Sequence, residues 1–117
     1  MIRSVSHVLL QVRELAAAEE FYVNLLGFTV RERSTLRDGR PLTALNEGLG
    51  LTLFPEGVDP GFKTVDHIAF RVVDLHPFID RLVGVNRSYE GPVTTPRYGN
   101  SMYFLDPEGN RIELHDG

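Results

Sequence analysis

The sequence predicts an α+β fold built from two βαβββ modules. The first observation behind this prediction is a repeat: "VSHVLLQVREL" (residues 5–15) and "VDHIAFRVVDL" (residues 65–75) align without a gap, and His7 matches His67. The second is that a helical pattern follows each copy, and the third is that strand-like segments follow each helix. One such module is too small to bury a sheet face alone, so we expect the two modules to pack together or with a partner chain.

The first module, residues 1–57, is predicted to begin with the strand around His7 and to continue into a helix. Gly27 stands at the C-terminal cap position of that helix. Three strands are expected next, in residues 28–36, 40–46 and 49–54, with turns at Asp38-Gly39 and Glu47-Gly48. The apolar residues at helical spacing are Leu15, Ala18, Phe21 or Tyr22, and Leu25 or Leu26.

The second module, residues 64–117, is predicted to repeat this order after a Pro- and Gly-rich linker at residues 58–63. Asp74 is a suitable N-cap, and Gly84 is expected to close the helix. The predicted strands are a weakly marked one at residues 85–90 and two clear ones at 101–105 and 111–115, with a turn at residues 106–109. The apolar stripe of the helix consists of Leu75, Phe78, Ile79, Leu82 and Val83.

Composition narrows the class of protein. The chain has 117 residues, which suits a single domain, and 42% of them are hydrophobic. A net charge of -4 argues against binding to nucleic acid, which requires a basic face. The sequence contains no cysteine, and its N-terminal apolar run is too short for a signal peptide or a membrane span. We therefore expect a cytoplasmic protein with no membrane or nucleic-acid partner.

Strand alternation predicts a metal site. If Val8 and Ile68 pack against the helices, His7 and His67 face the other way. The same alternation in the last strand places Glu113 on the face opposite Ile112. Taken singly, each of the three is more simply a half-buried or solvated polar residue. Taken together, two imidazoles and one carboxylate with coordination positions left open are a suitable ligand set for a catalytic divalent metal.

Four segments carry a resemblance to a known family: the strand around His7, "FYVNLLGF" (21–28), "DHIAFRV" (66–72) and "YFLDPEGNRIELH" (103–115). In these segments the chain resembles the vicinal oxygen chelate superfamily, which includes glyoxalase I, extradiol dioxygenases, fosfomycin-resistance enzymes and bleomycin-binding proteins. The resemblance implies two modules that form a cup-shaped mixed sheet around a divalent ion (Fe, Mn, Ni or Zn). It also implies His7, His67 and Glu113 as ligands, a small-molecule substrate and a homodimer.

Departures from the family patterns bear on the reaction. Aligning "LTLF" with "IELH" places Thr52 opposite Glu113, so the fourth, carboxylate ligand typical of glyoxalase I is missing. The acid/base histidine of the dioxygenase pattern is absent from residues 94–96. Fosfomycin-resistance enzymes have a similar length, a tyrosine at the place of Tyr103 and a polar loop like residues 98–101, but their basic residues are matched only by Arg97.

These observations assign further roles. Tyr103 is the catalytic candidate, as a donor to a metal-bound oxygen, although a strand aromatic also serves as core. Arg71, Arg97 and Ser101 are the substrate-binding candidates. We expect a metal-dependent, glyoxalase-like lyase or isomerase that chelates vicinal oxygens of its substrate. The alternatives are an extradiol-type dioxygenase, a fosfomycin-resistance-like transferase, or a non-catalytic drug-binding or metabolite-binding protein of the bleomycin-resistance type.

Overall fold

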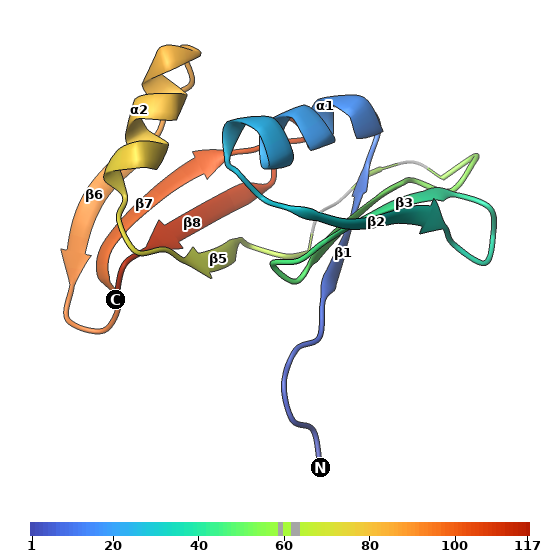
Figure 1. The fold of residues 1–117 in the computed structure, drawn as a ribbon, viewed down its shortest axis with the longest axis horizontal. Coiled ribbons are helices and arrows are strands. Elements are labelled where there is room, and N and C mark those ends of the chain that lie inside the picture. The colour runs from blue at the N-terminus through green and yellow to red at the C-terminus, as the bar shows by residue number, and fades with distance from the viewer. Residues whose placement is uncertain (59, 62–63) are drawn as a thin grey trace. The chain divides into compact units, whose positions relative to one another are not determined.

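The computed structural model describes residues 1–58, 60–61 and 64–117. The chain divides into two compact units, Met1–Gly61 and Phe62–Gly117. Each unit contains one helical segment and four strands, as the sequence predicts (Figure 1). The elements of the first unit are β1 (Val8–Val12), α1 (Leu15–Glu19), η1 (Glu20–Leu25), β2 (Val30–Thr35), β3 (Pro41–Leu45) and β4 (Leu49–Leu53). Those of the second are β5 (Ile68–Arg71), α2 (His76–Gly84), β6 (Glu90–Thr95), β7 (Gly99–Leu105) and β8 (Arg111–His115).

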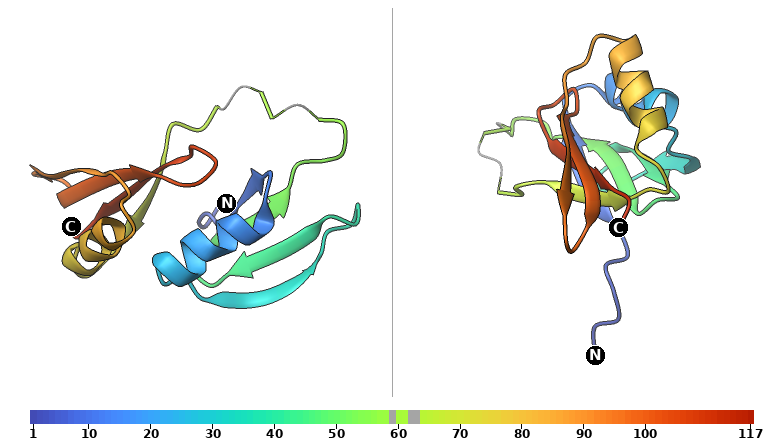
Figure 2. Two further views of the ribbon diagram at one scale, coloured as in Figure 1. Left: turned by 90° about the horizontal axis from the view of Figure 1, so that it is seen from above. Right: turned by 90° about the vertical axis from the view of Figure 1, so that its left-hand side faces the viewer.

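Both sheets have the same mixed topology. Their strand orders are β1-β4-β3-β2 and β5-β8-β7-β6. The first and last strands of each unit pair in parallel, and the other pairs are antiparallel. A parallel pair needs a long crossover, and the helix with its two following strands provides it within each unit (Figure 2). The α+β class and the two βαβββ modules are therefore confirmed.

The helical segment of the first unit turns two adjacent aromatic residues inward. After α1 the helix widens into the π-helical turn η1, where Phe21 and Tyr22 are 2% and 0% exposed. Tyr22 stacks edge to face on Phe21 at 5.2 Å and on Phe28 at 5.5 Å between ring centroids. The regular helical spacing allowed either Phe21 or Tyr22 to be buried, and the wider turn buries both.

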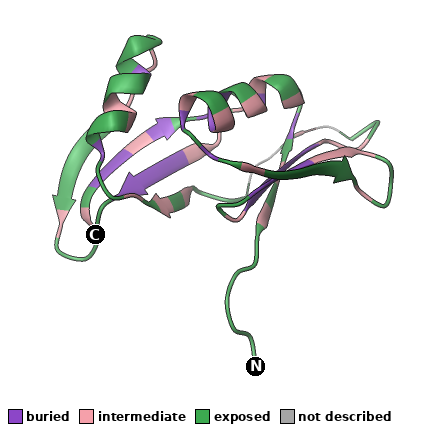
Figure 3. Ribbon diagram, in the orientation of Figure 1, coloured by how far each residue is buried: buried purple, intermediate pink, exposed green. Residues whose placement is uncertain are grey.

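The helix of the second unit is anchored by Leu82, which is fully buried, whereas its neighbour Val83 is 58% exposed. The prediction that Val83 belongs to the buried stripe is therefore wrong. The N-cap of α2 is Leu75, with no side-chain capping bond, so the prediction that Asp74 is the N-cap is wrong. Asp74 lies one residue earlier, and its carboxylate accepts a hydrogen bond from the His76 backbone N–H at 3.0 Å. Most buried residues of this unit lie in β7 and β8 (Figure 3).

The weakly marked strand predicted at residues 85–90 is wrong. Residues 85–87 instead complete the end of α2: Asn86 has a left-handed φ of 59°, and the Arg87 N–H donates to the Leu82 carbonyl at 2.9 Å. Because the chain curls back on the helix here, pairing with β7 begins only at Glu90.

The region between the units is described only in part. The predicted linker, residues 58–63, includes positions 59, 62 and 63, which lie outside the described residues. Its role and the arrangement of the chain as a single domain therefore remain predictions. Among the described helices, none combines the length and the apolar character needed to cross a membrane.

Candidate metal and substrate site

His67 and Glu113 come together on the second sheet. His67 directly precedes β5, and Glu113 lies in β8, where its register partner is Ala69. The two strands are parallel neighbours, so the side chains of the two residues share the sheet face opposite the buried Ile112. The distance from His67 Nε2 to Glu113 Oε1 is 3.1 Å.

Each of the two side chains makes a hydrogen bond to a further residue through the atom that does not face its partner. The Nδ1–H of His67 donates to Asp66 Oδ2 at 2.6 Å, and the Ser101 hydroxyl donates to Glu113 Oε2 at 3.1 Å. The Glu113 side chain is only 8% exposed, whereas that of His67 is 35% exposed. Such outer hydrogen bonds fix the orientation of metal-ligating imidazoles and carboxylates in other proteins.

The charge state of Asp66 determines which ring nitrogen of His67 carries the proton. A hydrogen bond from His67 and the charge of its imidazolium form lower the pKa of Asp66, and the charge of Arg111 lowers it further. Asp66 is thus ionised at neutral pH and can only accept, so Nδ1 is the protonated nitrogen. In the neutral ring, Nε2 then directs a lone pair toward the Glu113 carboxylate, an arrangement that is favourable only with a proton or a cation between the two atoms.

Tyr103, the predicted catalytic residue, borders this pair. It is the register partner of Glu113 in β7, and its ring meets that of His67 edge to face, with 6.2 Å between the centroids. The Arg111 guanidinium lies 4.3 Å from the Tyr103 ring centroid and 3.6 Å from a carboxylate oxygen of Glu90. Tyr103, Arg111 and Glu90 also line a cavity of about 280 Å³. Tyr103 therefore lies between the His67–Glu113 pair and this space.

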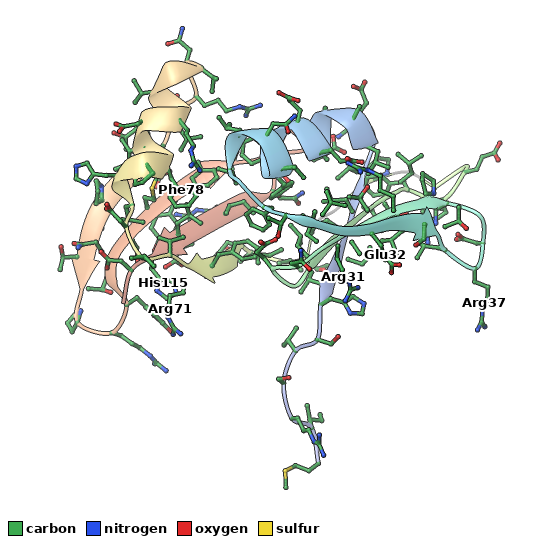
Figure 4. All side chains as sticks on the ribbon, in the orientation of Figure 1. Arg31, Glu32, Arg37, Arg71, Phe78 and His115 are labelled. Carbon is green, nitrogen blue, oxygen red and sulfur yellow. The ribbon has the colours of Figure 1, made fainter. Side chains whose placement is uncertain are left out.

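The other predicted site residues are more dispersed. Arg71 donates from Nε to the Gly117 carbonyl at 2.9 Å, and the Arg97 guanidinium lies 5.5 Å from the centroid of the Tyr98 ring. His115, the register partner of Arg71, is 7% exposed, and its Nδ1 has no hydrogen-bond partner among the described residues (Figure 4). Ser101, predicted to bind substrate, donates its hydroxyl to Glu113.

His7 lies in the first unit, directly before β1, and its Nδ1 is 3.0 Å from the Ser6 hydroxyl. Within the described part of either unit, no three His, Asp or Glu side chains gather as metal ligands. The structure thus brings together two of the three predicted ligands, and the third stands in the matching place of the other repeat.

The alignment that placed Thr52 opposite Glu113 is wrong. In the second unit Glu113 pairs with Ala69, and in the first the matching β1 residue, Leu9, pairs with Gly50. Gly50 is therefore the counterpart of Glu113. Thr52 is buried and donates its hydroxyl to the Pro41 carbonyl at 2.7 Å. The first unit still offers no carboxylate at this position.

Sequence reasoning missed the role of Asp66. The signal was its position directly before His67, but strand alternation places neighbours on opposite faces and so argues against their contact. His67 lies just outside β5, where alternation does not apply strictly, and the carboxylate reaches its ring.

Comparison with known proteins identifies the family of this chain. The family model described as "Glyoxalase/Bleomycin resistance protein/Dioxygenase superfamily" matches residues 4–114. The chain is 33% identical over 124 residues to glutathione transferase FosA from Serratia marcescens, an alignment that covers 100% of this chain and 83% of the relative. It is 30% identical over 125 residues to metallothiol transferase FosB from Staphylococcus epidermidis, with 100% and 86% covered.

A solved structure shows the same fold. It is a glyoxylase/bleomycin resistance protein/dioxygenase domain from Frankia sp. EAN1pec, which superposes with a TM-score of 0.80 at 23% identity and covers 100% of this chain and 99% of the other. The family match spans nearly the whole chain and includes His7, His67 and Glu113. The chain therefore belongs to the glyoxalase/bleomycin resistance protein/dioxygenase superfamily.

Proposed function

We propose that this protein is a metal-dependent enzyme that binds a small substrate through two adjacent oxygen atoms. His67, Glu113 and His7 hold a divalent ion. The observation that carries the proposal is the 3.1 Å approach of His67 Nε2 to Glu113 Oε1, with Asp66 and Ser101 fixing the opposite sides of the two groups. Two electron-rich atoms oriented in this way suit a shared cation.

The donor set fits such an ion. One imidazole nitrogen and one carboxylate oxygen already face each other, and a second imidazole completes a three-ligand set that leaves positions open for substrate. When bound, the ion supplies Lewis-acid stabilisation of negative charge on a substrate oxygen. Glu113 and His67 would hold the ion in place. The phenol of Tyr103 donates a hydrogen bond to a substrate oxygen beside these two residues.

The reaction class proposed first is transfer of a thiol to the substrate. Two relatives that match the whole chain are named as a glutathione transferase and a metallothiol transferase. In such a step the thiolate sulfur forms a bond to carbon while a carbon–oxygen bond breaks, and the released oxygen takes up a proton. A glyoxalase-like lyase or isomerase activity uses the same charge stabilisation and is the second reaction to assay.

Metal content and thiol consumption test the proposal. Purified protein is titrated with Mn²⁺, Fe²⁺, Ni²⁺ and Zn²⁺ by calorimetry, and the loaded protein is screened for loss of thiol against a panel of small oxygen-bearing substrates. We expect His67→Ala and Glu113→Gln to weaken metal binding at least about a hundredfold, while the exposed His76→Ala serves as the matched control. Wild-type protein that binds none of the four ions would contradict the proposal and favour a metal-free binding protein.

A mixing experiment tests whether two subunits share the site in the homodimer that we propose. His7→Ala and Glu113→Gln proteins each lack one ligand and are unfolded and refolded together. If His7 completes the site of the partner subunit, one of the two sites in each mixed dimer regains all three ligands and metal binding returns. If each chain builds its own site, the mixture binds no better than either variant alone.

A further inference from the structure

The first unit contains a cavity of about 340 Å³. It is lined in part by Leu9, Ala44 and Gly50, which are register partners across three neighbouring strands. Thr43, the neighbour of Ala44, instead donates its hydroxyl to Glu19 of α1 at 2.7 Å. Because adjacent strand residues face opposite ways, the cavity opens on the sheet face turned away from α1. Its volume is within the range of small-molecule sites, which starts at about 300 Å³.

The repeat allows the floor of this cavity to be compared with the second unit. Gly50 stands where the second unit has Glu113, and Ala44, the partner of Gly50, stands where it has Tyr103. A carboxylate and a phenol in one module are thus replaced by the two smallest side chains in the other. The replacement removes polar groups and leaves open space, so this face suits an apolar group.

The rim of the cavity carries a cation. Arg31, which Figure 4 labels, lines the cavity, and its guanidinium makes no hydrogen bond or ion pair with the described residues. Asn46 also lines the cavity, and its side-chain amide donates a hydrogen bond to the Thr29 hydroxyl at 2.9 Å. The walls are formed by leucines, namely Leu9, Leu36 and Leu42. The lining also includes two further polar residues, Ser6 and His7. Leucine walls beside one cation that has no partner among the described residues match a ligand with an apolar body and one anionic group.

We propose that this cavity binds the apolar body of a small anionic molecule, with the anionic group at Arg31 and with Gly50 setting the size of the group admitted. The inference rests on the proposed function in one respect: His7 also lines the cavity, so the bound molecule is the substrate of that site. It adds to the proposed function a substrate class, an apolar carboxylate or similar anion.

Gly50 limits the space directly. A Cβ at this position meets Leu9 Cδ1 at 3.0 Å and Leu42 Cδ1 at 3.5 Å, both of which are the mobile ends of side chains. The strand therefore tolerates a larger residue at position 50 if these ends shift. A leucine there extends into the cavity and occupies the volume that the ligand needs.

Two fluorescent probes test the inference. Anilinonaphthalene sulfonate has an apolar body and one anion, and phenyl-naphthylamine is the same molecule without the sulfonate. We expect Gly50→Leu to weaken the binding of both probes at least about tenfold, because the side chain fills the cavity. Thr35→Leu, which adds the same side chain at an exposed position on β2, leaves both affinities unchanged. Arg31→Gln weakens only the anionic probe, by about fivefold.

Equal probe binding by Gly50→Leu and Thr35→Leu would overturn the inference, as would equal weakening of both probes by Arg31→Gln. Circular dichroism shows whether each variant is folded. If Gly50→Leu does not fold, Ala44→Val is used instead, because Ala44 of β3 lines the same part of the cavity. Metal titration separates this test from the proposed function. Glu113→Gln loses metal but keeps the probe, whereas Gly50→Leu loses the probe but keeps the metal.

Discussion

Asp66 accepts a hydrogen bond from the ring nitrogen of His67 that faces away from Glu113, at 2.6 Å. This contact sets the tautomer that leaves Nε2 free to bind a metal. Replacing Asp66 with Asn removes the charge that favours this tautomer, so we expect metal affinity to fall by about 10-fold to 100-fold. Titration calorimetry with Mn²⁺ and Zn²⁺ measures the change.

Asp74→Asn is the matched control for this substitution. Asp74 also lies beside a histidine, with 3.7 Å between its Oδ1 and His76 Nδ1, but both residues are at the exposed start of α2. The Asp74→Asn substitution therefore changes only the turn at the start of α2 and leaves metal affinity as in the wild type. Equal affinities for Asp66→Asn and wild-type protein would show that Asp66 does not support the metal ligand.

Ser101→Ala tests the support behind the carboxylate. Glu113 is nearly buried, and Ser101 donates to its second oxygen at 3.1 Å. Because a buried carboxylate loses a donor, we expect the free energy of unfolding of the metal-free protein to fall by about 1.5–3 kcal/mol. Urea denaturation measures it, with the exposed Ser34→Ala as control. A loss no larger than that of the control would mean that water replaces the hydroxyl.

A pH dependence is expected from Glu19. Hydrogen bonds from Arg33 and Thr43 lower the pKa of this carboxyl from its usual 4.5, and burial opposes the shift. A lowered folded-state pKa means that the contribution to stability is complete above the unfolded-state value. It is lost as the pH falls below 4.5 and through the folded-state pKa.

Comparison with Glu19→Gln isolates this contribution. The difference in unfolding free energy between wild type and Glu19→Gln should be constant from neutral pH down to about pH 5 and should shrink below it. Urea denaturation across this range measures the difference. Glu14→Gln, at an exposed position before α1, is the control. A difference that does not change with pH would assign the stabilisation to packing of the side chain and not to its charge.

The sequence predicted the fold well because the spacing of apolar residues along a short segment indicates which element the segment forms and which of its faces is buried. The alternation of the last strand placed Glu113 on the face that it shares with His67, as the strand pairing and the 3.1 Å contact between the two side chains show. The repeat at His7 and His67 gave the two modules, which the shared sheet topology confirms.

Errors arose where a local pattern did not settle the geometry. After α2, Asn86 adopts a left-handed backbone and delays β6. An Asn just past a helix end is a signal for this conformation, but it is weaker than a Gly. The matching of Thr52 to Glu113 followed apolar similarity, but the pairing of Leu9 with Gly50 sets the true register. Register depends on hydrogen bonds between distant strands, and two apolar-rich strands can be aligned by sequence in more than one way.

Leu82 is the fully buried residue of α2, and its removal should show how much its packing contributes to stability. It is fully buried, so Leu82→Ala should lower the free energy of unfolding by about 2–5 kcal/mol, through lost apolar contact and the cavity left behind. Val83→Ala, the next residue, shortens a side chain that is 58% exposed, and it should cost less than about 1 kcal/mol. Urea denaturation measures both. Equal losses for the two variants would mean that α2 turns Val83 toward the sheet in solution, as the apolar stripe in the sequence predicted.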